Sequence, residues 1–401
     1  MIKGRDILVV GQQPWDVEIG SNCKNIAKEF SKNNRVLYVN SPLDRITAIT
    51  KKSDPKIQKR INVVKGKENG LVVIENNLWN LYPNRMVESI NWINNQQIFE
   101  YFNKINNKKF ANSIKEAVEL LGFKNYILFN DNDIFKSFYL KEMLLPTISI
   151  YYSRDYMLAV DYWKKHGEKL EPELIAKSDI CLSNSSYMAN YCKQYNPKSF
   201  NIGQGCDIEE FSSIKELTIP ADILPLNKPI IGYVGALIGF RLNISILLEI
   251  AKTKPDWSIV LVGPEDEEFE QSELHQTGNV YFLGSKPPSD LPKYINSFDI
   301  CLNPQILSQV TIGNYPRKID EYLAMGKPVI ATKTPFMEEV FSEYTYLGNT
   351  AEEYVILIER ALNENSDELI KARKDFAATH SWENNVLKIY DHINQFENNY
   401  K

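Results

Sequence analysis

Cysteine is scarce in this 401-residue sequence, and what little there is excludes several classes of protein. The five cysteines are scattered, odd in number and never spaced as C-x-x-C, which argues against a disulfide framework and against a zinc site and fits a reducing cytoplasm. No apolar run approaches the length that spans a bilayer. Positive charge is not in excess either, because the formal net charge is −5, so the sequence gives no indication of a nucleic-acid partner.

Two further absences concern the start of the chain. The apolar run Ile7–Val10 has only four residues, so it predicts a first β-strand rather than a signal peptide. The loop that follows, residues 11–20, lacks the G-x-G-x-x-G spacing, which argues against an NAD enzyme. Open α/β sheets bind ligands at the carboxyl ends of their strands, so this loop, with Gly11 and Trp15, is a candidate binding segment.

Short apolar runs alternate with helical patterns along most of the chain, an order that predicts parallel sheets covered by helices. The expected strands are 7–10, 36–39, 71–74, 126–129, 147–151, 180–183 and 199–202, followed by 230–234, 257–262, 279–283, 299–302, 328–331 and 345–347. The interval 41–70 is polar and basic with little periodicity, so we expect an irregular excursion there.

The length of the chain favours two domains over one. Two prolines and no clear period mark residues 208–228 as a linker. We therefore predict an amino-terminal Rossmann-like domain over 1–207 and a second Rossmann-like domain over 229–381, with a last helix over 382–397 that packs back on the first domain. The predicted fold class is α/β, with the two domains facing each other across a cleft.

The most informative stretch is residues 314–332. Pro316 suits the first turn of a helix, and Gly326 followed by Pro328 suits its end, so we expect a helix over 315–325 and then a short buried strand. A helix N-terminus with free N–H groups is an anion site. Asn314 or Tyr315 would stand at the cap of this helix.

Lys318 and Glu321 lie three residues apart and therefore share a face of that helix. One interpretation is functional, with the cation and the carboxylate both directed at a ligand. The alternative is structural, with Lys318 solvated and Glu321 paired with Arg317 across one turn. The order of Arg before Glu is the less favourable one for a helix pair, which favours the functional interpretation.

The stretch resembles the donor-binding segment of retaining nucleotide-sugar glycosyltransferases of the GT-B fold, the group 1 type. The family pattern P-x-K-x-x-E-Y-x-A-x-G-x-P-V is matched here at every fixed position. The resemblance implies that Glu321 holds the ribose hydroxyls and that the helix N-terminus, with Gly313, Asn314 and Tyr315 before it, faces the diphosphate. One position departs from the pattern, because many relatives carry a Glu where this chain has Gly313.

The same family resemblance extends over nearly the whole chain and is strongest over 179–207 and 230–383. It implies that Gly235, Ala236 and Arg241 meet the diphosphate, Arg241 through a planar fork suited to phosphate. It implies further that the loop of Gly284, Ser285 and Lys286 reads the base, and that Asp155 lies on the acceptor side. Bacterial enzymes that build surface polysaccharide, of the teichuronic-acid kind, are similar.

Asp131-Asn132-Asp133 has the spacing of a D-x-D metal motif, but it follows a predicted strand and opens a helical segment, where an aspartate usually caps. We expect no metal, because Arg241, Lys318 and a helix N-terminus can meet the charge of a diphosphate. His380 is expected to cap a helix rather than to act as a base.

The resemblance implies a hexosyltransferase that moves a sugar from a UDP- or GDP-linked donor to a hydroxyl of a glycan or lipid-linked acceptor. No metal or other cofactor would be needed, the anomeric configuration would be retained, and Arg241, Lys318 and Glu321 would carry the reaction. Such an enzyme would work in the cytoplasm, with a place at the inner face of the membrane. The alternatives are a non-catalytic GT-B protein that binds nucleotide sugar or serves as a scaffold, and a nucleotide-sugar epimerase on the same fold.

Overall fold

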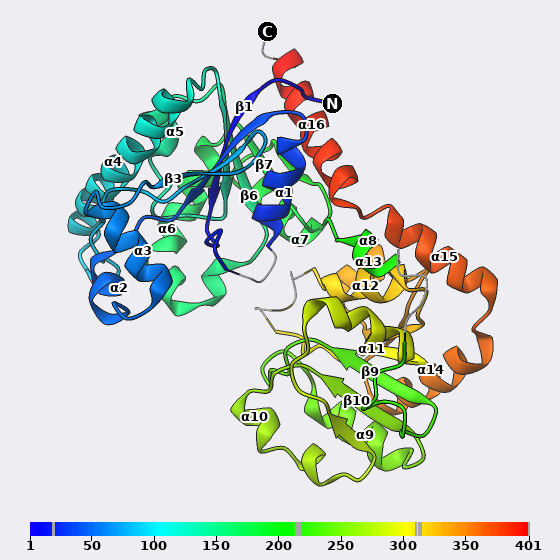
Figure 1. The fold of residues 1–401 in the computed structure, drawn as a ribbon. Coiled ribbons are helices and arrows are strands. Elements are labelled where there is room, and N and C mark those ends of the chain that lie inside the picture. The colour runs from blue at the N-terminus through cyan, green and yellow to red at the C-terminus, as the bar shows by residue number, and fades with distance from the viewer. Residues whose placement is uncertain (18–20, 213–217, 309–310, 312–314, 400–401) are drawn as a thin grey trace. The chain divides into compact units, whose positions relative to one another are not determined.

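The computed structural model describes residues 1–17, 21–212, 218–308, 311 and 315–399, which form two compact units (Figure 1). The first unit comprises residues 1–203 and 382–401, and the second comprises residues 204–381. This division differs from the predicted one, which ended the first domain at residue 207 and treated 208–228 as a linker. Ile208, Phe211 and Ile223 are buried in the core of the second unit, so the described parts of this interval belong to that unit.

The first unit is built on a sheet of eight strands among the described residues, in the order β3-β4-β2-β1-β5-β6-β7-β8. Neighbouring strands run parallel except β3 and β4, which pair antiparallel. The strands are β1 (Asp6–Gly11), β2 (Arg35–Asn40), β3 (Leu71–Glu75), β4 (Leu78–Leu81), β5 (Ile127–Asp131), β6 (Ile148–Ser153), β7 (Ile180–Ser183) and β8 (Ser199–Asn201). Strand β4 was not predicted from the sequence, because it has only four residues and follows β3 after a tight turn at Asn77 with φ of 65°.

Alternate residues of the central strand β1 enter cores on the two faces of this sheet. Ile7 and Val9 pack with α1 (Asn22–Ser31) and with α16 (Trp382–Asn399), which lie against each other. Leu8 and Val10 pack on the other face against α4 (Gln96–Leu121). The helices α5 (Leu140–Leu144), α6 (Asp161–Lys177) and α7 (Ser186–Lys193) also belong to this unit.

The expectation of an irregular excursion over 41–70 is wrong, because two helices form there. They are α2 (Arg45–Thr50) and α3 (Pro55–Val64). Asp44 caps the first by accepting from the Thr47 amide, and Asp54 caps the second, which has a proline in its first turn. The helices escape a periodicity analysis because both are short and α2 buries none of its residues.

The second unit has a sheet of six parallel strands among the described residues, in the order β11-β10-β9-β12-β13-β14. The strands are β9 (Ile230–Val234), β10 (Ser258–Val262), β11 (Val280–Phe282), β12 (Ile300–Asn303), β13 (Val329–Thr332) and β14 (Tyr346–Gly348). Its α-helices are α8 (Ile208–Ser212), α9 (Ile244–Thr253), α10 (Glu267–Glu270), α11 (Leu291–Ser297), α12 (Arg317–Ala324), α13 (Pro335–Val340), α14 (Ala351–Glu364) and α15 (Asp367–Ala378). The α/β class predicted for both halves is confirmed.

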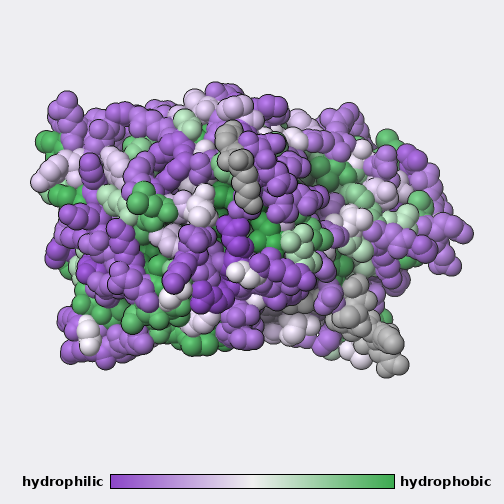
Figure 2. All heavy atoms as spheres, turned by 90° about the horizontal axis from the view of Figure 1, so that it is seen from above, coloured by the Kyte–Doolittle hydropathy of each residue, from purple (hydrophilic) through white to green (hydrophobic). Residues whose placement is uncertain are grey.

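The surface seen in Figure 2 is mainly hydrophilic, with apolar residues in small scattered groups. Charged residues make up 24% of the sequence, and they are rarely buried unless paired. Among the described helices, none combines the length and the apolar character that crossing a bilayer requires.

Candidate functional site

The carboxyl end of β9 turns at Gly235, whose φ is 143°. A Cβ atom added to this glycine would lie 3.0 Å from both Lys318 Nζ and Tyr233 Oη, so a side chain would intrude on the lysine. The neighbouring strand β10 ends in the same way at Gly263, where an added Cβ would lie 1.9 Å from the carbonyl oxygen of Gly235. The two glycines therefore let two strand ends and a lysine ammonium come together.

The helix that supplies this lysine is α12, and its ends follow the predicted chemistry in part. It ends at Ala324, and Gly326, directly after the cap residue Met325, has φ of 73°. Gly326 leaves no room for a side chain, because a Cβ atom added there would lie 2.6 Å from Ile370. The helix begins at Arg317, with Pro316 as its cap residue and no side-chain cap, one to two residues later than expected. Tyr322 fixes the helix on β9, because its hydroxyl oxygen accepts a hydrogen bond of 2.9 Å from the Val234 amide.

Lys318 is held at the strand end and is not a freely solvated surface lysine. Its ammonium donates a hydrogen bond of 2.6 Å to the Tyr233 hydroxyl and lies 4.4 Å from the centre of the Tyr233 ring. A phenol orients the ammonium without neutralising it, and no carboxylate forms an ion pair with it among the residues that the structure describes. The positive charge of Lys318 therefore remains available for an anion.

Glu321 is half-buried, and within the described part of the chain its carboxylate has neither a hydrogen bond nor an ion pair. The structural alternative assigned Glu321 to Arg317, but the salt bridge of Arg317 runs to Asp207 at 3.2 Å. Burial raises the pKa of Glu321, and the charges of Arg317 and Lys318 oppose that rise. A half-buried carboxylate without a bonded partner is suited to accept hydroxyl groups from a ligand.

Arg241 is exposed, and its backbone is fixed on both sides. Its amide donates to the Ile238 carbonyl at 2.9 Å, and its own carbonyl accepts from the Ile306 amide at 2.8 Å. The guanidinium lies 5.4 Å from the ring of Phe240 and forms no ion pair among the described residues. Ala236, which follows Gly235, is also exposed.

The loop expected to read the base presents its backbone rather than a free charge. Lys286 donates to Asp222 at 2.8 Å, and the same carboxylate accepts from the Tyr294 hydroxyl at 3.0 Å. These hydrogen bonds raise the pKa of Lys286. Gly284 has φ of 66° and open surroundings, and Ser285 is exposed, so these two residues leave the loop accessible.

Tyr315 directs its side chain into the protein. Its hydroxyl lies 3.1 Å from His380 Nδ1, which in turn lies 2.7 Å from the fully buried Asp320. Its ring packs on Phe336. Any contact of Tyr315 with a ligand would therefore come from its backbone, while His380 joins α12 to the end of α15. Gly313 and Asn314, also expected at the site, lie outside the described residues.

In the first unit, Gly11 and the segment of Trp15 stand at the carboxyl end of β1. The glycine is required by packing, because an added Cβ would lie 2.0 Å from Tyr38 Oη. The Trp15 amide donates to Asn40 at 2.8 Å, and its ring meets Tyr38 edge-on at 5.0 Å between centroids. Asp16 forms an ion pair with Arg60 at 2.7 Å, which fixes the segment further.

Asp131 and Asp155 are joined by an arginine between them. Arg154 donates to the buried Asp131 at 2.9 Å and to Asp155 at 2.6 Å. Burial alone would lower the pKa of Arg154, but the two carboxylates outweigh it and raise that pKa. Asp133 caps the following turn by accepting from the amides of Phe135 and Lys136. The residues of the D-x-D sequence thus have separate structural tasks, and no metal-binding group of His, Cys, Asp and Glu occurs within the described residues.

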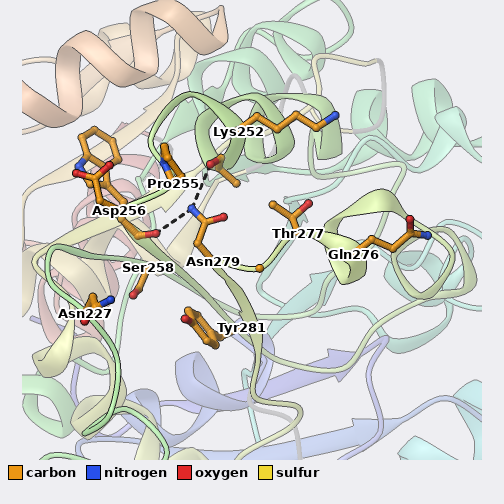
Figure 3. Close-up of a pocket in the computed structure, with 12 residues that line it drawn as sticks. Asn227, Lys252, Pro255, Asp256, Ser258, Gln276, Thr277, Asn279 and Tyr281 are labelled. Carbon is orange, nitrogen blue, oxygen red and sulfur yellow. Dashed lines mark hydrogen bonds between the residues drawn. The ribbon is translucent and has the colours of Figure 1, made fainter.

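A cavity of about 560 Å³ lies elsewhere in the second unit (Figure 3). Ser258 and Tyr281 place it at the amino ends of β10 and β11, at the sheet edge opposite Gly235. Asn279 projects there to bind the carbonyls of Ala251 and Trp257, which joins β11 to the end of α9. None of the predicted site residues lines this cavity.

Two residues at the carboxyl edge were not predicted from the sequence. Tyr233 positions Lys318, and Gly263 makes room for Gly235. A signal for Gly263 exists in the sequence, because the run Leu261-Val262-Gly263 repeats the strand-then-glycine ending Tyr233-Val234-Gly235. No local signal marks Tyr233, because its pairing with Lys318 spans 85 positions.

Comparisons with known proteins find similarity to glycosyltransferases. Residues 215–380 match the family model described as Glycosyl transferases group 1. A 235-residue segment is 27% identical to TuaH of Bacillus subtilis (strain 168), named as a teichuronic acid biosynthesis glycosyltransferase; it spans 56% of this chain and 59% of that protein.

Solved structures of GT-B glycosyltransferases have the same fold. Sucrose-phosphate synthase from Thermosynechococcus elongatus is 16% identical with a TM-score of 0.65 and covers 98% of each chain. Anabaena HepE with UDP and glucose is 15% identical with a TM-score of 0.64, over 98% of this chain and 100% of that one. The chain thus has the GT-B fold, and its second half is similar to the group 1 glycosyltransferases.

Proposed function

We propose that the chain is a hexosyltransferase that moves a sugar from a nucleotide diphosphate sugar to a hydroxyl of a glycan or lipid-linked acceptor. The observation that carries this proposal is the meeting of Lys318 and Gly235 at the carboxyl end of β9, with Glu321 three residues further along α12. The ammonium suits a diphosphate, the glycine lets the backbone approach it, and the carboxylate suits ribose hydroxyls.

The chemistry asked of these groups is limited. When the glycosidic bond breaks, negative charge grows on the departing diphosphate, so a fixed cation stabilises the transition state more than the ground state. Lys318 is fixed by the Tyr233 hydroxyl, and Arg241 stands on a loop whose backbone is anchored at Ile238 and Ile306. Glu321 would meet hydroxyls whose charge does not change, so it would contribute to donor affinity. Retention of configuration and independence from metal are part of the proposal.

The nature of the donor and of the acceptor is proposed from the relatives. The HepE structure contains UDP and glucose, which makes uridine diphosphate the first nucleotide to test. TuaH is named for teichuronic acid biosynthesis, which favours an acceptor in a cell-envelope polysaccharide and a place of work in the cytoplasm at the inner face of the membrane.

Calorimetry with uridine and guanosine diphosphates, in the presence of EDTA, tests the binding half of the proposal. Lys318→Ala should weaken binding by about 1.5–3 kcal/mol, the range for a hydrogen bond to a charged group, and Glu321→Gln should weaken it less. Lys252→Ala is the matched control, because Lys252 lies on α9 of the same unit and forms an exposed ion pair with Glu273. Wild-type affinity in Glu321→Gln with a lowered melting temperature would show that the carboxylate is structural.

Slow release of free nucleotide from nucleotide sugars tests the catalytic half. Hydrolysis without acceptor, reduced in Lys318→Ala by a lower kcat, is the expected result. Tight binding without turnover would instead indicate a non-catalytic nucleotide-sugar protein, and conversion of the sugar without nucleotide release would indicate an epimerase. An absolute requirement for Mn²⁺ or Mg²⁺ would contradict metal independence.

A further inference from the structure

Several segments of the first unit leave its sheet at the same edge. The helices α2 and α3 follow β2, Trp92 follows β4, and Tyr162 at the start of α6 follows β6. Because these strands are parallel, their carboxyl ends lie together, and the segments gather at the edge that also carries Asp131 and Gly11. Figure 1 shows α2 and α3 beside each other at this end of the unit.

Several large apolar side chains at this edge are mostly exposed to solvent. α2 buries none of its residues, and Ile46 and Ile49, three positions apart on one face, are 52% and 69% exposed. Trp92 is 72% exposed. Its indole N–H donates to the Ser89 carbonyl at 2.8 Å, while the Ser89 hydroxyl accepts from the Ile46 amide at 3.1 Å, so the tryptophan and α2 are fixed side by side.

The apolar surface continues onto the start of α6. The Asn91 side chain donates to the Tyr162 carbonyl at 3.0 Å, which places Tyr162 next to the segment of Trp92. The Tyr162 side chain is 56% exposed. We name the set of Ile46, Ile49, Trp92 and Tyr162 the apolar rim.

The segment that carries α2 and α3 is strongly basic although the whole chain is acidic. Residues 45–67 contain eight lysines and arginines against the single Asp54, a net charge of +7, whereas the chain has −5. Arg45 and Arg60 are neutralised by Glu88 and Asp16. The lysines at 51, 52 and 56 are exposed and form no ion pair among the described residues.

We propose that the apolar rim and Lys51, Lys52 and Lys56 rest on the surface of an anionic lipid bilayer. Unpaired lysines beside exposed isoleucines and aromatic rings suit the headgroup region, where rings lie at the interface and ammonium groups meet lipid phosphates. Nucleic acid is a poorer match, because isoleucines offer its bases no stacking surface. The bilayer would present a lipid-linked acceptor directly to the carboxyl edge. Only this last step rests on the proposed transfer reaction.

Vesicle co-sedimentation of the full chain tests the inference, with phosphatidylcholine vesicles and with vesicles that also contain phosphatidylglycerol. The wild type should bind the anionic vesicles far better than the neutral ones. Replacing Lys51, Lys52 and Lys56 by Gln should weaken this binding by about 100-fold, at about fivefold per lysine. The variant Ile49→Ser/Trp92→Ser should weaken it by about tenfold or more at unchanged charge.

Matched controls come from the opposite edge of the same unit. Lys3, Lys115 and Lys124 are exposed and form no ion pair among the described residues, so their replacement by Gln changes the net charge equally. Leu120 is an exposed apolar residue near the far end of α4, and Leu120→Ser is the apolar control. These controls should bind like the wild type. All variants should keep wild-type affinity for nucleotide diphosphate by calorimetry, which separates a failure here from a failure of the proposed donor site.

Three results would overturn the inference. They are absence of binding to anionic vesicles, an equal loss in the control variants, and binding of a single-stranded oligonucleotide as tight as vesicle binding and insensitive to Ile49→Ser/Trp92→Ser.

Discussion

At the carboxyl edge of the first sheet, charged side chains bind one another: Arg154 joins Asp131 to Asp155. At the same edge of the second sheet, Lys318 is bonded to a phenol, and Glu321 has no bonded partner among the described residues. The strands at both edges run parallel. A glycine stands at the end of a central strand in each sheet, Gly11 as the last residue of β1 and Gly235 directly after β9. The two edges therefore differ in how their charges are satisfied.

This difference indicates what each edge can bind. In the second unit, an incoming diphosphate would supply the opposite charge that Lys318 lacks, so the site is completed by its ligand. In the first unit, Arg154, Asp131 and Asp155 already satisfy one another, and exposed lysines and apolar side chains lie on the segments that follow the strands. A small polyanion therefore matches the edge of the second unit, and an extended surface matches the edge of the first unit.

The largest effect should come from removing the ion pair between Arg154 and Asp131 in the first unit. Arg154→Met leaves the buried Asp131 carboxylate without its cation, and removing one partner of a buried pair typically costs about 3–5 kcal/mol. Urea denaturation should show this loss, and Arg154→Met/Asp131→Asn should recover most of it. Arg360→Ala, which breaks a solvent-exposed pair with Glu364, should change the free energy of unfolding very little. A loss for Arg154→Met as small as that of Arg360→Ala would contradict the comparison.

The next largest effect should come from a substitution of Gly263, which lies against Gly235 at the carboxyl edge of the second sheet. Gly263→Ala puts a methyl group 1.9 Å from the Gly235 carbonyl oxygen, a backbone atom that cannot rotate away. We expect a loss of about 2–3 kcal/mol in the free energy of unfolding, as for overpacked cores, and a nucleotide affinity at least about tenfold lower. Gly278→Ala is the control, because nothing lies within 4 Å of its added methyl. Unchanged nucleotide affinity in Gly263→Ala would show that Gly263 does not shape the nucleotide-binding site.

The sequence was sufficient for the fold because strands and helices alternate with clear end signals, and Gly326 ends α12 as expected. It failed where the deciding contacts are distant. The helices over 45–64 are too short for a period to appear, and the burial of Ile223 joins the supposed linker to a core formed much later in the chain.

The same reason limits what could be said of the site. The pattern around Lys318 and Glu321 is local, so the sequence alone was enough to propose both residues as candidates. That Lys286 is engaged by Asp222 and that Tyr315 turns inward to His380 depends on partners 64 and 65 positions away.

A third carboxylate of the first unit shows what happens without a cation. Glu171 on α6 is fully buried and accepts from the hydroxyls of Tyr151 at 2.7 Å and Tyr191 at 3.2 Å. Burial raises its pKa to about 6, against these hydrogen bonds. The pKa of Glu171 is therefore higher in the folded than in the unfolded chain. The protonated Glu171 then stabilises the fold fully below the unfolded pKa of 4.5, and this contribution of about 2 kcal/mol is lost as the pH rises through about 6.

Glu171→Gln should remove this pH dependence. The free energy of unfolding of the wild type, measured in urea at a series of pH values, should fall more than that of the variant between about pH 4.5 and pH 7, by about 2 kcal/mol. The exposed Glu343→Gln serves as the control and should follow the wild type. Parallel profiles for wild type and Glu171→Gln would show that the two phenols hold the carboxylate ionised throughout.

The smallest effect compares one chemical change at both edges. Tyr38 donates to the Gln13 carbonyl at 2.5 Å in the first unit, and Tyr233 accepts from Lys318 at 2.6 Å in the second. Each Tyr→Phe change removes one hydrogen bond, worth about 1 kcal/mol. Tyr38→Phe should lower the free energy of unfolding by that amount and leave nucleotide affinity unchanged. Tyr233→Phe keeps the ring beside the Lys318 ammonium but removes the hydroxyl that fixes the position of that ammonium. Nucleotide diphosphate should therefore bind about fivefold more weakly by calorimetry, while the free energy of unfolding changes little. If Tyr233→Phe instead lowered stability as Tyr38→Phe does and bound nucleotide normally, the Tyr233–Lys318 bond would be another satisfied structural contact, and the contrast between the two edges would not hold.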